Sequence, residues 1–147
     1  MKRIVVEVIS VLILSLFLYA AISKIMDYSV FKEQLADSPI LGRISGFLAW
    51  MLPAFELALV VLLAVPRWRL KGLYTSLVLL LVFIVYIIVM MATVDHLPCS
   101  CGGLLEQLSW KGHIIFNGIF SLLAAIAIRL QKQLIRHNRS DIISGFA

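Results

Sequence analysis

The chain has 147 residues, of which 62% are hydrophobic and only 14% are charged, and its formal net charge is +5. A soluble globular protein is about 45–50% apolar and about 25% charged, so this composition excludes an ordinary soluble domain, a disordered chain and a collagen-like fibre. Long apolar runs also exclude an outer-membrane β-barrel, whose strands alternate apolar and polar residues. The sequence therefore predicts a small all-α integral membrane protein.

Four apolar stretches have approximately the length of about 20 residues that a membrane-spanning helix needs. Their approximate limits are 4–23, 44–65, 72–94 and 113–130. The uncharged part of the fourth stretch is short, so we expect Lys111 and Arg129 to snorkel to the two interfaces. Because backbone groups in lipid must be hydrogen-bonded within their own segment, each stretch is expected to be a helix. Residues 1–130 are thus predicted to form a single four-transmembrane-helix bundle, and residues 131–147 a polar tail that frays.

The basic residues are unevenly distributed among the connections between these stretches. The N-terminus, the second connection (residues 66–72) and the tail each carry an excess of Lys and Arg. The first and third connections contain comparable numbers of basic and acidic residues. The positive-inside rule therefore predicts that both termini and the second connection are cytoplasmic, and that the first and third connections are extracytoplasmic. We expect a multi-pass protein of the bacterial cytoplasmic (inner) membrane, in contact with the lipid bilayer.

The first extracytoplasmic connection has an amphipathic pattern. Phe31, Leu35 and the pair Ile40 and Leu41 recur at nearly helical spacing among polar residues. This pattern predicts a short amphipathic helix at the outer surface, which the Ser38-Pro39 pair terminates.

The sequence contains only two cysteines, Cys99 and Cys101, and both lie in the third connection. A disulfide between them closes a very small, strained ring, and strained disulfides are more easily reduced and exchanged. Pro98 stiffens the chain before the pair, whereas Gly102 and Gly103 allow unusual backbone angles after it. A structural disulfide would instead join distant segments, because closing a longer loop stabilises more. The motif therefore favours a redox-active pair on the oxidising side of the membrane.

Two other interpretations of the cysteines remain open. His96 or His113 could join the two thiolates in a metal site, and such a soft ligand set suits Cu(I) or Zn²⁺. The cysteines could also have no chemical role. If the pair is redox-active, a nearby imidazole would lower the pKa of a thiol, with His113 as the first choice and His96 as the second.

Ionisable side chains within a membrane span are costly and are functional candidates for that reason. Glu56 lies well inside the second predicted span, three residues after Pro53. Lys24, at the outer end of the first span, is the nearest cation by topology, although helical rise gives a difference in depth of about 10 Å. A structural ion pair between Glu56 and Lys24 and a proton-handling role for Glu56 both remain open.

Several polar side chains are expected to converge toward the connection that contains the cysteines. His113 and Asn117 are four residues apart and therefore share one face at the outer end of the fourth helix. Tyr86, Met90 and Thr93 share a face of the third helix that leads to the same connection. Such convergence is typical of a site.

Three groups of residues in the predicted four-span core form a recognisable pattern. They are Tyr19-Ala20-Ala21 with Lys24 and Asp27; Leu52-Pro53 with Glu56; and Pro98-Cys99-Ser100-Cys101-Gly102-Gly103 with Glu106, Trp110, His113, Phe116 and Asn117. The pattern resembles the MauE/DoxX-like membrane proteins, and its cysteine-to-asparagine stretch is the most specific part. The name of the family comes from methylamine utilisation. Its namesake is implicated in maturing the small subunit of methylamine dehydrogenase, a periplasmic protein rich in disulfides.

The resemblance implies a four-helix bundle with a role in disulfide or electron exchange outside the cytoplasm. We therefore expect five residues to take part in the chemistry: Cys99, Cys101, His113, Glu56 and Lys24. The expected supporting residues are Asn117, Pro98, Gly102, Gly103, Glu106 and Trp110. The electron partner would be a thioredoxin-like or disulfide-containing extracytoplasmic protein, or a membrane quinone. No nucleotide-binding signature or nucleic-acid partner is indicated, and a non-catalytic assembly factor is the third class of function to consider.

Overall fold

The computed structural model describes residues 1–93 and 110–145, with side chains described for residues 1–93 and 111–138. Its elements are α1 (Lys2–Met26), α2 (Tyr28–Ala36), the short 3₁₀ turn η1 (Gly42–Ile44), α3 (Ser45–Ala64), α4 (Arg69–Thr93) and α5 (Trp110–Gly145). All regular structure in these two ranges is helical. Four of the helices, α1, α3 together with η1, α4 and α5, are long and apolar enough to cross a membrane. The predicted all-α, four-span architecture is therefore confirmed.

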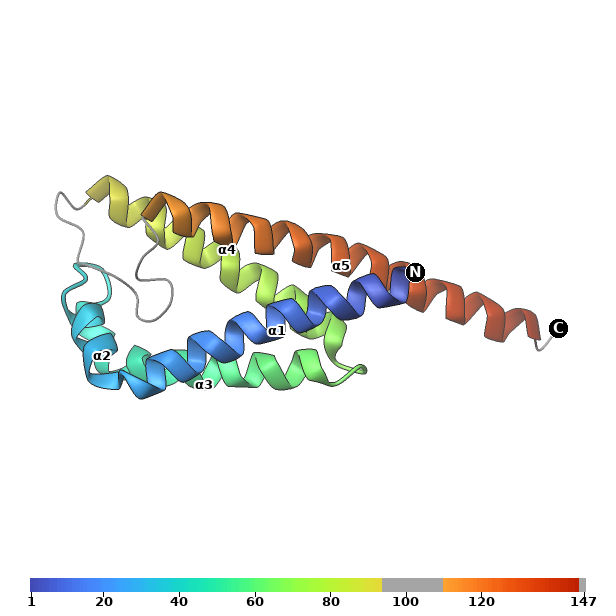
Figure 1. The fold of residues 1–147 in the computed structure, drawn as a ribbon, viewed down its shortest axis with the longest axis horizontal. Coiled ribbons are helices and arrows are strands. Elements are labelled where there is room, and N and C mark those ends of the chain that lie inside the picture. Colours follow the sequence, from blue (N-terminus) through green and yellow to red (C-terminus); the bar gives the residue numbers. More distant parts are fainter. Residues whose placement is uncertain (94–109, 146–147) are drawn as a thin grey trace.

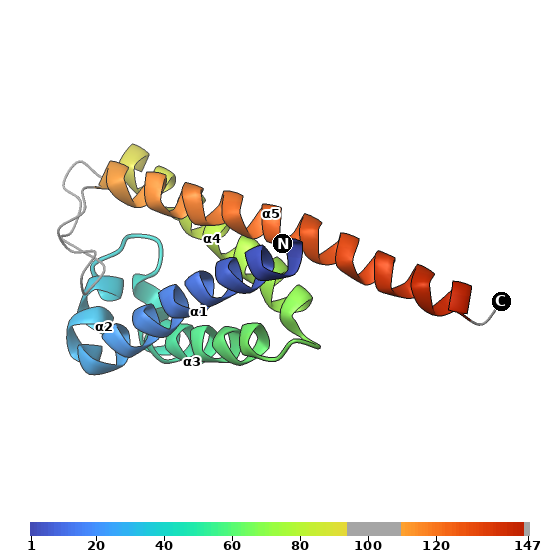
Figure 2. The same ribbon diagram turned by 45° about the vertical axis from the view of Figure 1, so that its right-hand side comes forward.

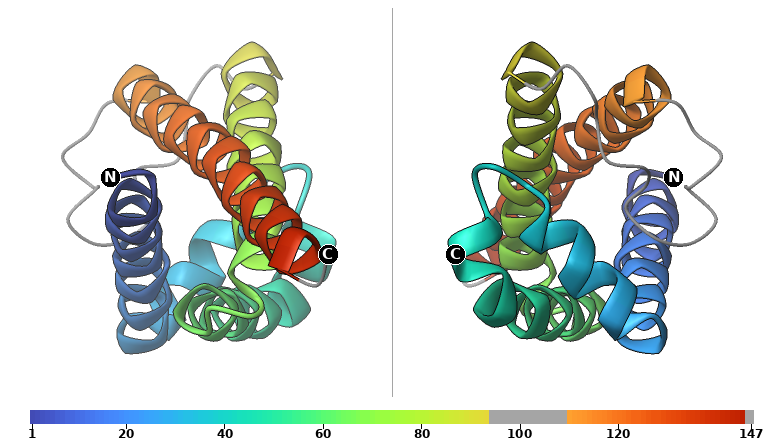
Figure 3. Two further views of the ribbon diagram at one scale, coloured as in Figure 1. Left: turned by 90° about the vertical axis from the view of Figure 1, so that its right-hand side faces the viewer. Right: turned by 90° about the vertical axis from the view of Figure 1, so that its left-hand side faces the viewer.

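The four long helices run side by side in one bundle (Figures 1 and 3). Helix α1 packs against α3 and α5, and α4 packs against α5 and α3. The two chain termini lie toward one end of the bundle, which we call the terminal end, together with the turn between α3 and α4. The opposite end holds α2, the last turn of α4 and the first turn of α5, and we call it the α2 end. The segment between α4 and α5, residues 94–109, is therefore attached on both sides at the α2 end.

The outward faces of the long helices are apolar. Val78, Val82 and Val85 on α4, for example, are each 58% exposed. A surface of this kind is stable only against lipid, so these side chains contact the bilayer. Trp50, near the start of α3, and Trp68, in the α3–α4 turn, are exposed close to opposite ends, as is typical of aromatic residues at the two membrane interfaces.

The main apolar core joins all four spans in the half of the bundle nearer the terminal end. Its buried members are Ile9, Ile13 and Phe17 from α1; Leu59 and Leu63 from α3; Leu73 and Leu80 from α4; and Ala124, Ala127 and Ile128 from α5. In lipid, helices associate through close packing rather than through the hydrophobic effect. Gly72 shows how close this packing is, because a Cβ atom there would lie 3.1 Å from the backbone carbon of Leu62 and the backbone nitrogen of Leu63.

The predicted amphipathic helix is present as α2, and it ends at Ala36, just before Ser38 and Pro39. Its buried side chains, Phe31 and Leu35, pack with Ala49 of α3 in a second apolar cluster. Ile40, which the sequence pattern grouped with them, lies beyond the helix and is exposed. The helical periodicity stops at Pro39, so the pattern could not place Ile40.

Gly42 allows the chain to turn back from α2 into α3. A Cβ atom at Gly42 would lie 2.6 Å from the carbonyl oxygen of Ala36, which no other residue type could accommodate without a shift of the backbone. The turn holds α2 against the start of α3. Helix α2 therefore lies across the ends of α1 and α3 that are farthest from the chain termini.

The fourth predicted span lies within a helix that is longer than the span. Helix α5 begins at Trp110, and its part Lys111–Asn138 is long and apolar enough to cross a membrane. The expectation that the tail frays is wrong, because α5 continues without a break to Gly145 and extends past the rest of the bundle (Figure 2). Gln131, Lys132, Gln133 and Leu134 are good helix formers, which favours continuation of the helix beyond the apolar stretch.

The charged side chains divide sharply between the two ends. Among the described side chains, the terminal end has a single acidic residue, Glu7, against eight basic ones. These are Lys2, Arg3, Arg67, Arg69, Lys71, Arg129, Lys132 and Arg136. At the α2 end, Lys24, Lys32, Arg43 and Lys111 are balanced by Asp27, Glu33, Asp37 and Glu56. This asymmetry is the basis for the predicted orientation, with the terminal end toward the cytoplasm.

Candidate functional site

A buried ion pair joins α1 and α3 in the half of the bundle nearer the α2 end. The ammonium nitrogen Nζ of Lys24 lies 2.9 Å from Oε1 and 3.3 Å from Oε2 of Glu56, and it also donates to the carbonyl oxygen of Ala20 at 3.2 Å. The side chain of Lys24 is 20% exposed and that of Glu56 is 8% exposed. The long apolar stem of the lysine lets the charged group reach inward from the last turn of α1, which overcomes the difference in depth expected from the sequence.

Helix α2 also contributes to the surroundings of this ammonium group. Lys24 Nζ lies 5.6 Å from the centroid of the Phe31 ring, within the range of a cation–π interaction. Phe31 is itself buried. A single cation therefore contacts side chains of α2 and α3 as well as the backbone of its own helix, which ties three elements together at this point.

A second polar contact at this end connects the segment after α2 with α4. The buried Ser38 hydroxyl lies 3.1 Å from the Tyr86 hydroxyl, accepts the backbone N–H of Leu41 at 3.4 Å and donates to Sδ of Met90 at 3.8 Å. The sequence predicts for Ser38 only a role in ending the amphipathic helix. The one signal for a further role was that a polar residue follows the amphipathic stretch, which is too common to identify a site.

The residues predicted on one face of α4 divide into two groups. Met90 is buried and Tyr86 is partly buried, and both contact Ser38 as described. Thr93 is exposed, and its hydroxyl donates to the carbonyl oxygen of Val89 in its own helix. Thr93 therefore does not join the contact of Ser38 with Tyr86 and Met90, and its expected position next to the cysteine segment stays a prediction because residues 94–109 lie outside the described residues.

Helix α5 places a stripe of polar side chains in the interior. His113, Asn117 and Ser121 recur every four residues, and all three are buried. The Asn117 amide donates to the carbonyl oxygen of His113 at 2.8 Å, and the Ser121 hydroxyl donates to that of Asn117 at 2.8 Å. These bonds within the helix partly satisfy the amide and the hydroxyl, which lowers the cost of burying them. The shared face predicted for His113 and Asn117 is therefore observed.

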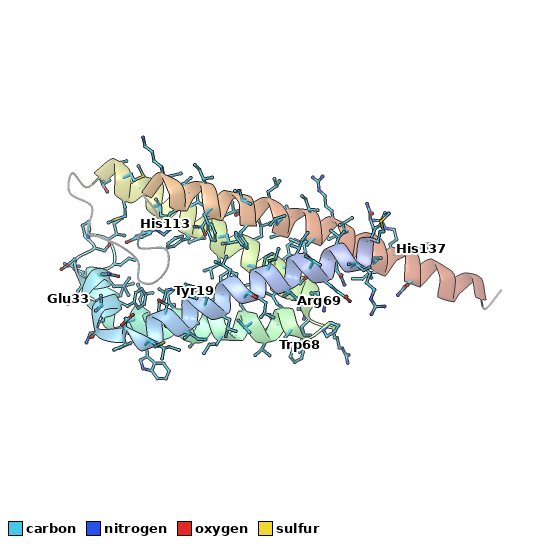
Figure 4. The ribbon with its side chains drawn as sticks, viewed as in Figure 1. Tyr19, Glu33, Trp68, Arg69, His113 and His137 are labelled. Atoms are coloured by element: carbon cyan, nitrogen blue, oxygen red, sulfur yellow. The ribbon has the colours of Figure 1, made fainter. Side chains whose placement is uncertain are left out.

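Seven of the predicted site residues lie in the segment 94–109, outside the described residues: His96, Pro98, Cys99, Cys101, Gly102, Gly103 and Glu106. For Trp110 only the helical backbone is described. The remaining predicted residues, Lys24, Glu56, His113 and Asn117, are all in the half of the bundle where that segment is attached. Figure 4 shows His113 and Glu33 toward this end, and Arg69 and His137 toward the other.

The described side chains alone provide no metal centre. Over the ranges with described side chains, no group of three or more His, Cys, Asp and Glu residues could hold a metal ion. The predicted metal site required both cysteines, which lie outside those ranges, so this interpretation stays a prediction. The described part of the site consists of one ion pair, hydroxyl and amide groups and one imidazole, which can orient and exchange protons.

Four spanning helices, an apolar core toward one end and a polar interior toward the other define a multi-pass helical membrane protein with a candidate site at its α2 end. The model of the family described as "Methylamine utilisation protein MauE" matches residues 2–130. The chain therefore belongs to the MauE family, in agreement with the sequence pattern. No curated protein and no solved structure matches the chain.

Proposed function

We propose that the protein supports thiol–disulfide exchange in extracytoplasmic proteins through Cys99 and Cys101, in a role resembling the maturation of methylamine dehydrogenase. The observation that carries the proposal is the shared location of the cysteine segment and the polar interior. The segment begins after Thr93 and ends before Trp110, so it is attached at the α2 end. The ion pair between Glu56 and Lys24 lies in the same half of the bundle. With the terminal end toward the cytoplasm, the segment faces the periplasm of a bacterial inner membrane.

The exchange transfers two electrons and two protons. In the maturing direction, a thiolate of the partner attacks the Cys99–Cys101 disulfide and forms a mixed disulfide with one cysteine, which releases the other as a thiolate. The partner's second thiolate then attacks the mixed bond. The partner thus leaves oxidised, as a disulfide, and the Cys99–Cys101 pair is left reduced, as a dithiol. A thioredoxin-like protein or a membrane quinone then accepts the two electrons and restores the disulfide. The small ring favours this direction, because a strained disulfide is the stronger oxidant.

His113 is the proton carrier in this proposal. Its imidazole is buried in the first turn of α5, a few residues after the cysteine segment ends. An imidazole at such a position can accept a proton from a thiol and return it to a leaving thiolate. Lys24, Glu56 and Asn117 support the surrounding helices and do not contact the reacting atoms in this scheme.

The test is a titration of the purified protein with a maleimide mass tag across a series of glutathione redox buffers. Because the chain has only two cysteines, the number of tags reports directly on the proposed pair. We expect both tags to disappear together in one two-electron transition. The Cys99→Ser variant, which retains a single thiol, is the matched control: it can lose its tag only by forming a mixed disulfide with glutathione, which adds the mass of a glutathionyl group and thereby differs from the intramolecular disulfide.

Two outcomes would favour other functions. If both thiols remain reduced across the series and copper or zinc copurifies stoichiometrically, the cysteines form a metal site instead. If a variant with both cysteines replaced by serine still supports maturation of the partner protein, the chain is a non-catalytic assembly factor.

A further inference from the structure

The basic terminal end of the bundle has far more positive charge than the acidic side chain described there can neutralise. Glu7 is the only carboxylate among the described side chains there. Its Oε1 lies 3.3 Å from Nε of Arg3 and 3.9 Å from Nη1 of Arg69, so two guanidinium groups share one carboxylate. The other cations of this end have no carboxylate within ion-pair distance in the part of the chain described.

Arg69 is the most enclosed of these cations. Its side chain is only 16% exposed, at the first residue of α4, where it faces Glu7 on α1. The Nε atom has no hydrogen-bond partner in the described structure, and the contact with Glu7 is longer than a hydrogen bond. A guanidinium group has five N–H donors in a planar fork that fits phosphate oxygens. Because Nε is itself buried, a further anion meets the exposed part of the Arg69 side chain, whose positive charge Glu7 at 3.9 Å neutralises incompletely.

Two further cations, one on α5 and one on α1, have neutral partners at this end. Nζ of Lys132 lies 5.1 Å from the centroid of the Tyr74 ring on α4. Lys2 of α1 donates to the neutral amide oxygen of Gln133 at 3.1 Å. These contacts orient the ammonium groups but do not neutralise them. Cations from α1, α4 and α5 are thus gathered at one end of the membrane-spanning part.

We propose that the terminal end binds the phosphate headgroup of an anionic phospholipid, with Arg69 at the centre of the binding surface. The excess positive charge of this end favours an anionic ligand, and the position of the basic residues near the membrane interface favours a lipid. Arg69 directly follows the exposed Trp68, an aromatic residue typical of the headgroup region. Lys132 lies on α5 four residues after Ile128, the last residue of the apolar stretch of that helix before Arg129. Lipid phosphates occupy this depth at high local concentration, and basic residues near the surface strengthen their binding. The inference is independent of the proposed thiol chemistry.

The test is native mass spectrometry of the full-length protein in detergent, with phosphatidylglycerol and phosphatidylcholine of identical acyl chains. We expect phosphatidylglycerol to bind more tightly, and Arg69→Gln to weaken its binding by about fivefold, as expected for one basic residue near lipid headgroups. Lys32→Gln removes an exposed charge at the α2 end and should leave lipid binding unchanged. Lys132→Gln, at an exposed position, provides a second test if Arg69→Gln does not fold.

Three outcomes would overturn the proposal. The first is equal binding of the two lipids by the unmodified protein. The second is a loss in Lys32→Gln as large as that in Arg69→Gln or Lys132→Gln, which would indicate a nonspecific effect of net charge. The third is displacement of phosphatidylglycerol by inorganic phosphate alone, which would show that the surface recognises a free anion rather than a lipid.

Discussion

Replacing Glu56 with methionine removes the carboxylate that neutralises Lys24 and leaves an ammonium group partly buried in the bundle. The cation then keeps only the carbonyl oxygen of Ala20, at 3.2 Å, and the face of the Phe31 ring, at 5.6 Å. Neither partner carries a formal negative charge. We therefore expect Glu56→Met to destabilise the protein even though methionine is similar in size and more apolar.

The magnitude follows from the burial of the two groups. Removing one partner of a buried ion pair costs about 3–5 kcal/mol when the remaining charge is fully enclosed. Lys24 is 20% exposed and close to the end of α1, so it can turn toward the interface and recover part of this loss. We expect a net cost of about 2 kcal/mol for Glu56→Met. The double variant Lys24→Met with Glu56→Met leaves no charge behind and should lie within about 1 kcal/mol of the unmodified protein.

The assay is a double-mutant cycle on the free energy of unfolding, measured from the loss of helicity during titration with a denaturing detergent in mixed micelles. Glu33→Met is the matched control, because Glu33 is an exposed glutamate on α2. We expect this control to change the free energy of unfolding by less than about 0.5 kcal/mol.

Two results would refute the reasoning. One is a Glu56→Met variant that is as stable as Glu33→Met, because Lys24 would then need no counterion. The other is a double variant that loses the sum of the two single losses, since this would mean that the two side chains act independently.

Three further predictions concern the rest of the candidate site and the packing of the helices. His113→Gln should slow the oxidation of a model dithiol peptide by about 100-fold in stopped-flow fluorescence while the redox potential of the cysteine pair is unchanged, and an unchanged rate would contradict a proton-transfer role. Ser38→Ala and Tyr86→Phe should each lower the free energy of unfolding in detergent by about 1 kcal/mol, and the double variant should lower it by little more than either single variant. Additive losses would exclude a hydrogen bond between the two hydroxyl groups. Gly72→Ala should lower the free energy of unfolding by about 1–3 kcal/mol, because the new Cβ atom meets the backbone of α3. Gly118→Ala, where a Cβ atom would have nothing within 4 Å, should raise the free energy of unfolding by up to about 1 kcal/mol. The opposite order of stabilities would contradict the packing.

The spans and α2 could be predicted because lipid and water impose strong patterns on the sequence. A bilayer requires long apolar helices, and the alternation around Phe31 and Leu35 gave the amphipathic helix. Hydropathy locates the limits of the apolar zone rather than the ends of a helix. Hydropathy therefore predicts an end near residue 130, although α5 continues through the good helix formers at residues 131–134 and on to Gly145.

The candidate site was predictable only where burial has a large cost. A charged side chain inside a membrane span is costly without an ion-pair partner, so the sequence alone indicates Lys24 as a partner for Glu56. The contact between Ser38 and Tyr86 has no comparable signal, since it depends on how the chain between α2 and α3 folds over α4. Thr93 shares its helical face with Tyr86 in the sequence pattern, yet it is exposed because it lies in the last turn of α4.

The two halves of the bundle are held together by different interactions, and the difference bears on function. Nearer the terminal end, close-packed apolar side chains join the four spans. Toward the α2 end, Lys24 and Glu56 fix α1 against α3, and Ser38 fixes the segment after α2 against Tyr86 of α4. Directional contacts hold side chains in defined positions, which is a requirement for thiol exchange, in which the attacking and leaving sulfur atoms must align. They occur in the half of the bundle where Cys99 and Cys101 are attached, as expected if the exchange chemistry takes place there.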